Sequence, residues 1–239
     1  IDRMELARVG QRTEHKYIGV MCGIMDQAIS CLGKKGSLLR LDCRSGEYEY
    51  FPWHPKGYQL VLVNSCVKHS LAGSPYNERR LQCGHVAEII GQKHPEVKSL
   101  RDATIEMLEE VKGDITGDEY KRARYVIGEV ERVLAVCDAL KNDDYEMVGK
   151  MMYETHYGLS KEYEVSCEEL DYLNDIAKET GVTGSRIMGG GFGGCTINLV
   201  AKELVDNFKK VVKEKFAEKY GKEPVIIDVV IGDGARKLC

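Results

Sequence analysis

Residues 189–194 read GGGFGG, and the segments on either side of this run decide how the sequence folds. The letters fit the GxGxxG pattern of dinucleotide-binding folds, which requires a strand before the run and a helix after it. A strand pattern, residues 195–201, follows the run, so we reject dinucleotide binding. Two interpretations stay open: close packing of backbone against backbone, which glycine permits, or a nest of backbone N–H groups facing a phosphate or a bound substrate.

Outward from the run, strand and helix patterns come in blocks. Strand 195–201 is followed by helix 202–220 and strand 225–231. Upstream, the patterns predict strands over 37–43, 47–53 and 59–67 and helices over 2–17, 24–32, 77–91, 101–112, 117–141, 143–160 and 166–180. Because strands and helices do not alternate strictly, we expect an α+β fold. From about Gln59 onwards it should hold a mostly antiparallel sheet backed by helices.

Composition restricts the class of protein. The 239 residues include 34 Lys and Arg against 38 Asp and Glu, so no basic excess indicates a nucleic-acid partner. Unbroken apolar runs reach about four residues, whereas a membrane span needs about 20. The nine cysteines contain no CxxC pair, which argues against a zinc cluster and favours reduced thiols in the cytoplasm. We therefore expect a cytoplasmic protein without nucleic-acid or membrane partners.

Asp26 is a candidate general base. The stretch CGIMDQ, residues 22–27, places it in the first turn of the predicted helix 24–32. A carboxylate at this position commonly interacts with the positive end of the helix dipole. Alternatively, Asp26 accepts a proton from a substrate beside Gly23, where the missing side chain lets a ligand approach the backbone. Spacing alone does not choose between these roles.

Glu14 is a candidate metal ligand. It lies in the charged stretch RTEHK, residues 12–16, for which a solvated helix face is the ordinary interpretation. A carboxylate on a helix can instead help to hold Mg²⁺, whose sites usually combine one or two carboxylates with phosphate oxygens.

Tyr76 is a candidate ligand contact. It is the last but one residue of the segment KHSLAGSPYN, residues 68–77, which joins a predicted strand to a predicted helix, a common place for functional loops. His69 and Ser70 are neighbours in sequence and no nucleophile elbow is present, so a hydrolase dyad is not indicated. A capped loop is the ordinary interpretation, whereas a tyrosine here can also pack against a polar ligand and hydrogen-bond it.

Together these segments resemble the galactokinase family of the GHMP kinase superfamily, and the resemblance extends over nearly the whole chain. Besides the glycine run, the matching stretches are GIMDQ (23–27), LDCRS (41–45), NSCVKHS (64–70), YKRAR (120–124), YEVSCEELD (163–171) and GSRIM (184–188). The resemblance implies transfer of the γ-phosphoryl group of MgATP to the C1 hydroxyl of α-D-galactose.

The resemblance also implies roles for single residues. Asp26 matches the catalytic aspartate of the family, and Glu14 its magnesium-binding glutamate. Gly23 and Tyr76 match sugar-contacting positions. Gly190 and Gly191, within the glycine run, match a motif near the sugar and the phosphates.

Two parts of the family pattern are not recognisable: the N-terminal signature that holds the sugar and a catalytic arginine, and the Gly/Ser-rich phosphate loop. On the resemblance, residues 1–56 form the last piece of the GHMP kinase N-terminal domain, and residues 57–239 form the C-terminal domain. We expect a missing N-terminal part that packs on residues 1–56, and no activity from these 239 residues alone. A galactose sensor without catalysis and an N-acetylgalactosamine kinase are the alternatives.

Overall fold

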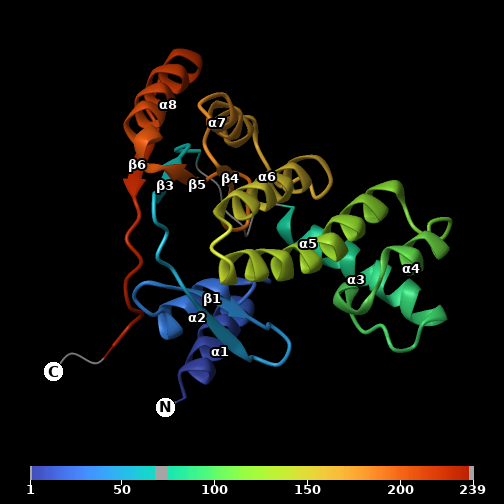
Figure 1. Ribbon diagram of the computed structural model, residues 1–239. Helices are drawn as coiled ribbons and strands as arrows, with labels where there is room; N and C mark the ends of the chain where they lie inside the picture. The colour runs from blue at the N-terminus through green and yellow to red at the C-terminus, as the bar shows by residue number, and fades with distance from the viewer. Residues whose placement is uncertain (1, 68–74, 237–239) are drawn as a thin grey trace. The chain divides into compact units, whose positions relative to one another are not determined.

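The computed structural model describes residues 2–67 and 75–236, and the chain divides into two compact units (Figure 1). Unit 1 comprises residues 1–56 and 229–239, and unit 2 comprises residues 57–228. The sequence placed residues 229–239 with the second domain. In the structure this segment returns to unit 1, where the Gly234 N–H donates to the carbonyl of Gly33 at 2.8 Å.

Unit 1 contains two helices, a π-helical turn and a two-stranded hairpin. Its elements are α1 (Arg3–Thr13), η1 (Glu14–Ile18), α2 (Met25–Leu32), β1 (Ser37–Leu41) and β2 (Tyr48–Pro52). The strands pair antiparallel, with Leu39 opposite Tyr50. The core comes from apolar residues spaced three or four apart on the two helices, Met4 with Ala7 and Ala28 with Leu32, because this spacing gathers side chains on one helix face.

Unit 2 begins with a strand, continues through five helices and ends in strands around a further helix. Its elements are β3 (Tyr58–Asn64), α3 (Tyr76–Lys93), η3 (Leu100–Asp102), α4 (Ile105–Glu110), α5 (Gly117–Lys141), α6 (Tyr145–Lys161), α7 (Glu168–Glu179), β4 (Gly184–Ile187), β5 (Cys195–Ala201), η4 (Lys202–Leu204), α8 (Val205–Tyr220) and β6 (Val225–Asp228). The long helix α5 begins at a capping box, in which Thr116 and Glu119 each satisfy the other's backbone N–H.

The sheet of unit 2 confirms the α+β prediction. Its four strands run in the order β4-β5-β3-β6, and every neighbouring pair is antiparallel. The sequence missed β4, whose four residues include Gly184 and Arg186 and lack an apolar alternation. Because β4 and β5 form an antiparallel hairpin, the glycine run is the loop between two strands and not the strand-to-helix turn of a dinucleotide site.

Two apolar clusters hold unit 2 together. In one, α7 and α8 pack with the sheet (Figure 1), burying Val61 and Val63 of β3 against Phe208 and Phe216. Val61 and Val63 lie on the same face of β3, because alternate residues of a strand share a face. Each fully buried side chain of this size contributes about 1.5–3 kcal/mol. The other cluster joins α3, η3, α4 and α5 around residues such as Ile90.

Helix α6 lies directly against β4 through two glycines. A Cβ on Gly149 would lie 2.2 Å from the carbonyl oxygen of Thr183, and one on Gly184 would lie 2.4 Å from the Cα of Gly149. Real Cβ atoms do not approach other atoms this closely, so both positions need glycine.

Every cysteine that the structure describes is a free thiol. Among the described helices, none combines the length and the apolarity that a bilayer span requires.

Candidate functional site

The six residues proposed from the sequence fall in both units. Glu14, Gly23 and Asp26 belong to unit 1, whereas Tyr76, Gly190 and Gly191 belong to unit 2.

Glu14 opens the π-helical turn η1 that follows α1. Its carbonyl accepts hydrogen bonds from the N–H groups of Gly19, at 3.0 Å, and Val20, at 3.3 Å. Its side chain is half-buried. The sequence predicted a regular helix over 2–17, because a π turn leaves the apolar pattern of so short a stretch unchanged. Such π-helical turns occur frequently at functional sites. The turn at Glu14 is therefore an indication of a site that could not be read from the sequence.

Asp26 is exposed in the first turn of α2, as the sequence predicted. Gly23, just before the helix, is also exposed, and a Cβ added there would meet no atom within 4 Å. No packing contact therefore accounts for this glycine, and a ligand has room to approach its backbone. The helix N-terminus has no side-chain cap, since Ile24 is its N-cap residue, so the dipole favours a negative charge nearby.

Both carboxylates, Glu14 and Asp26, affect the pKa of the Cys22 thiol. Burial raises the pKa of Cys22, and the negative charges of Glu14 and of Asp26 raise that pKa further. The negative charges of both carboxylates therefore influence the same thiol of unit 1. The Cys22 carbonyl is fixed by two side chains that precede it, at 3.1 Å from Nε2 of Gln11 and 2.8 Å from Nε2 of His15. These contacts join α1 and the π turn to the segment just before α2.

Tyr76 is the first residue of α3 and is half-buried. Pro75 precedes it as the N-cap residue, with a backbone φ of −66°. His69, Ser70 and the rest of the 68–74 segment lie outside the described residues. Burial raises the pKa of the Tyr163 phenol.

Close packing explains the glycine at one position of the run but not at another. Gly191 has a φ of +82°, and a Cβ there would lie 2.1 Å from the carbonyl oxygen of Val165. Gly189 has a φ of +84°, but its Cβ would meet no atom within 4 Å. Close packing therefore explains Gly191. At Gly189 the requirement is only the left-handed backbone, and the side where a Cβ would stand is open.

Two further contacts fix the run. The N–H of Phe192 donates to the Val165 carbonyl at 2.7 Å. The carbonyl of Gly194 accepts from both the N–H and the hydroxyl of Ser65, each at 2.9 Å. Phe192 itself has a φ of +61°, which is uncommon for a residue with a side chain and marks a backbone held by its surroundings.

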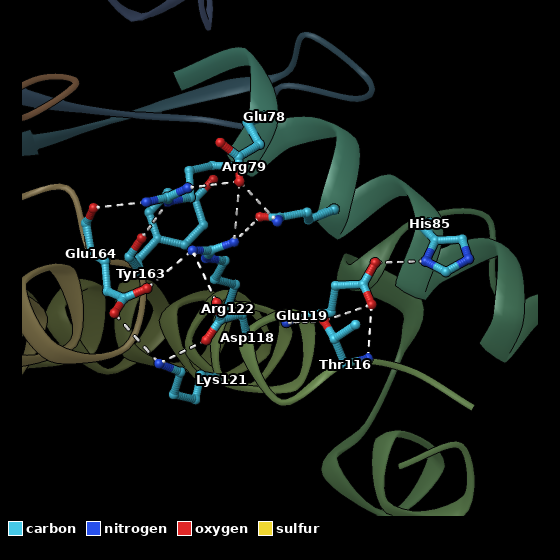
Figure 2. Close-up of polar contacts among 11 residues, drawn as sticks. Glu78, Arg79, His85, Thr116, Asp118, Glu119, Lys121, Arg122, Tyr163 and Glu164 are labelled. Atoms are coloured by element: carbon cyan, nitrogen blue, oxygen red, sulfur yellow. Dashed lines mark hydrogen bonds and ion pairs between the residues drawn. The ribbon is translucent and has the colours of Figure 1, made fainter. Parts of the chain in front are cut away.

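A cluster of charged residues that the sequence did not predict includes the residues just after Tyr76 (Figure 2). We call it the arginine cluster; it comprises Glu78, Arg79, Asp118, Lys121, Arg122 and Glu164. A signal for it exists: Arg79 precedes Cys83, Val86 and Ile90 at helical spacing, so it occupies the apolar face of α3. A cation at such a position is either paired or functional.

The chain is similar to known proteins in sequence and in structure. The family model for the GHMP kinase C-terminal region matches residues 137–218. Galactokinase of Clostridium acetobutylicum is 42% identical over the whole chain, which covers 61% of that relative. Human galactokinase is 40% identical over 98% of the chain, which covers 57% of it. The crystal structure of Lactococcus lactis galactokinase complexed with galactose matches all of the chain and 62% of that protein, at 33% identity and a TM-score of 0.93.

The chain is therefore similar over its whole length to proteins of the GHMP kinase superfamily. Within that superfamily, its relatives across the whole length are galactokinases, at 37–42% identity. The chain spans about 60% of the length of these relatives.

Proposed function

We propose that the protein to which these residues belong is a galactokinase, which transfers the γ-phosphoryl group of ATP to the C1 hydroxyl of α-D-galactose. One observation carries the proposal. The fold of all 239 residues matches the galactokinase–galactose complex at a TM-score of 0.93 and 33% identity, well above what a shared superfamily fold requires. We assign unit 1 without its returning segment to the N-terminal domain, and residues from 57 onwards to the C-terminal domain.

Asp26 is the general base of the proposed reaction. A sugar hydroxyl is a weak nucleophile at neutral pH, and a carboxylate within hydrogen-bond reach accepts its proton as it reacts. The C1 oxygen attacks the γ-phosphorus, the bond to the β–γ bridging oxygen breaks, and ADP leaves with that electron pair. The exposure of Asp26 at the start of α2, and the open space beside Gly23, support this role.

Mg²⁺ fits the carboxylates of unit 1. Glu14 offers one carboxylate, at the start of the π turn η1. Mg²⁺ sites typically combine one or two carboxylates with substrate phosphates. Glu14 would hold the ion, and the bound ion would neutralise charge on the phosphates. No group of three or more His, Cys, Asp and Glu suited to a metal occurs among the residues that the structure describes.

Tyr76, Gly190 and Gly191 are the proposed contacts from unit 2. The tyrosine begins α3 and presents an aromatic ring with a hydroxyl, which together suit a sugar. In the glycine run the open side of Gly189 leaves room for the backbone N–H groups to face substrate oxygens. The cytoplasmic location predicted from the free thiols stays a prediction.

The test is a turnover assay on the protein expressed from its complete reading frame. ATP, Mg²⁺ and galactose are supplied, and galactose 1-phosphate is followed by phosphorus NMR. We expect stoichiometric ADP and sugar phosphate, with little product from glucose or N-acetylgalactosamine. Galactose binding without any product would indicate the sensor alternative, and preferential phosphorylation of N-acetylgalactosamine would indicate the other kinase. Either result would contradict the proposal.

A further inference from the structure

Arg79 of α3 and Arg122 of α5 are buried cations outside the proposed catalytic residues. Their side chains are 10% and 5% exposed. Burying a charge is costly unless it is paired and hydrogen-bonded. The arginine cluster supplies that pairing with three cations and three anions, contributed by α3, α5 and the segment between α6 and α7 (Figure 2).

Both arginines hold the same three-residue loop, Tyr163–Val165. Nε of Arg79 donates to the carbonyl of Tyr163 at 2.9 Å, and a second guanidinium nitrogen donates to the carbonyl of Glu164 at 3.3 Å. Arg122 forms an ion pair with the carboxylate of Glu164 at 3.0 Å. One arginine thus fixes the backbone of the loop and the other fixes its side chain.

The loop requires such support. Glu164 has a φ of +57°, in the left-handed region that residues with a side chain rarely adopt. Strained backbone of this kind persists where the surrounding structure holds it. The two arginines contact Glu164 from α3 and α5, elements more than forty residues away in sequence, as the separations of 85 and 42 residues record.

The loop in turn sets the glycine run. The carbonyl of Val165 accepts the N–H of Phe192 at 2.7 Å, and it occupies the place that a Cβ on Gly191 would take. A displaced Val165 would therefore shift Gly191 and Phe192 with it. Arg79 also lies in the same first turn of α3 as Tyr76.

We propose that Arg79 and Arg122 are positioning residues for the glycine run, acting through the Tyr163–Val165 loop. The inference rests on the proposed function, in which Gly190 and Gly191 contact the substrates. The arginines touch neither substrate. They fix the backbone that does, and a small displacement of a substrate-positioning group can cost about 10²-fold in rate.

Hydrogen exchange of the backbone amides tests the coupling without any activity. The variants are Arg79→Met, which removes the bonds to the loop backbone, and Glu164→Gln, which removes the ion pair with Arg122 and leaves that backbone intact. Arg124→Met is the matched control, because Arg124 also lies on α5 and pairs with Glu162 at 2.8 Å, next to the loop. We expect faster exchange at residues 189–194 in the first two variants, by about tenfold or more, since local opening exposes the Phe192 amide. Strands β3 and β5 and the control should be unchanged.

Kinetics supply the second readout. In the protein from the complete reading frame, Arg79→Met should lower kcat by up to about 10²-fold, with a smaller rise in KM for galactose. Arg79→Lys should recover part of the loss, because one ammonium group retains a donor to the loop but lacks the planar fork. Arg124→Met should turn over at the parent rate.

Several outcomes would overturn the inference. Unchanged exchange at residues 189–194 in folded Arg79→Met protein would contradict it. Equal acceleration in every peptide would contradict it too, because that indicates general destabilisation. If Arg79→Met fails to fold, Glu164→Gln decides by the same criterion. Absence of galactose phosphorylation by the parent protein would contradict the proposed function alone, while the exchange result still decides the positioning role.

Discussion

Asp26 occupies the second position of α2, exposed, at a helix start without a side-chain cap. The same place in α8 is held by Asp206, which is also exposed in a first turn. Both carboxylates stand in the first turn of an α-helix, where the helix dipole favours a negative charge. The two differ in surroundings, since the exposed Gly23, where a Cβ would meet no atom within 4 Å, lies three residues before Asp26. Asp206 is therefore a control for the electrostatic part of any effect at Asp26.

For Asp26→Asn, we expect kcat for galactose phosphorylation to fall by about 10²–10⁴-fold, the contribution typical of a general base. The amide keeps the size of the side chain and loses the proton acceptor, so galactose should still bind. Steady-state kinetics and calorimetric titration with galactose check the two parts. Asp206→Asn should leave kcat unchanged, and a near-parent rate in Asp26→Asn would show that Asp26 is not the base.

For Tyr76→Phe, we expect KM for galactose to rise by about tenfold or more, because an unpaired buried sugar hydroxyl costs about 1–3 kcal/mol. KM for ATP should change less. Initial-rate measurements with each substrate varied in turn separate the two constants. Tyr157→Phe, at a tyrosine of α6 that is 60% exposed, is the control. An effect confined to ATP would contradict the assignment of Tyr76 to the sugar.

Gly191→Ala and Gly189→Ala form a matched pair. Both residues have nearly the same positive φ, so each alanine suffers similar backbone strain, on the order of 1–3 kcal/mol. Only at position 191 does the new Cβ also collide with the Val165 carbonyl. Thermal unfolding should therefore show the larger loss for Gly191→Ala. Equal losses would mean that the Val165 loop gives way readily.

At the scale of elements, α6 and α7 are joined by a His–Asp pair, in which the histidine is buried and the aspartate half-buried. Nε2 of His156, whose side chain is 5% exposed, lies 3.2 Å from Oδ1 of Asp171. Asp171 also accepts hydrogen bonds from the hydroxyls of Ser160, at 2.7 Å, and Ser166, at 2.5 Å. Burial by itself would raise the pKa of Asp171, but the bonds from His156, Ser166 and Ser160 outweigh it and hold that pKa well below its ordinary value.

A depressed folded-state pKa fixes the direction of the pH dependence. The stabilisation by Asp171 is complete above the unfolded-state pKa of about 4 and is lost as the pH falls further towards the folded-state pKa. We expect the free energy of unfolding to decline below about pH 4 in the parent protein and to decline less steeply in Asp171→Asn. Urea unfolding at several pH values measures both slopes. Asp175→Asn, at another acid of α7, is the control, and parallel slopes for Asp171→Asn and the parent would refute the prediction.

Most elements could be predicted because their apolar spacing is long and regular. The helix predicted over 117–141 is α5, with the same bounds, and its capping residues mark the start. Short or irregular elements were missed for physical reasons. Strand β4 has four residues, too few for an alternation, and becomes a strand through pairing with β5. The π turn η1 differs from a helix only in its hydrogen-bond pattern.

The sequence suggests a candidate site where residue type and resemblance coincide, as at Asp26 and the glycine run, and the roles of these residues stay predictions. The contacts that hold the glycine run could not be predicted. Arg79 and Glu164 are 85 residues apart in sequence, and their link depends on how α3, α5 and the loop after α6 pack. No local pattern encodes that packing. The sequence also could not predict why position 191 requires glycine, because the requirement comes from the nearby carbonyl of Val165.

At the scale of the whole molecule, ligand binding should stabilise the folded protein. A ligand that binds only the folded state at 100 times its Kd adds about 2.7 kcal/mol. For a domain of 150–250 residues, that corresponds to a rise in Tm of roughly 5–10 °C, and a longer chain shows a smaller rise. Galactose should produce the rise in the protein from the complete reading frame, and glucose should not. Asp26→Asn should keep it. No shift with galactose at saturating concentration would contradict the proposed substrate.

The contact of α6 with β4 has a consequence for genetics. At Gly149 and Gly184 the obstacles to a Cβ include main-chain atoms of the opposite element, the Thr183 carbonyl and the Gly149 Cα. Trimming a neighbouring side chain therefore creates no room, unlike at an ordinary overpacked core position. A selection for second-site suppressors of Gly149→Ala should return true revertants and no compensating change at the contact. We therefore expect that a second substitution at this pair of positions does not rescue the first.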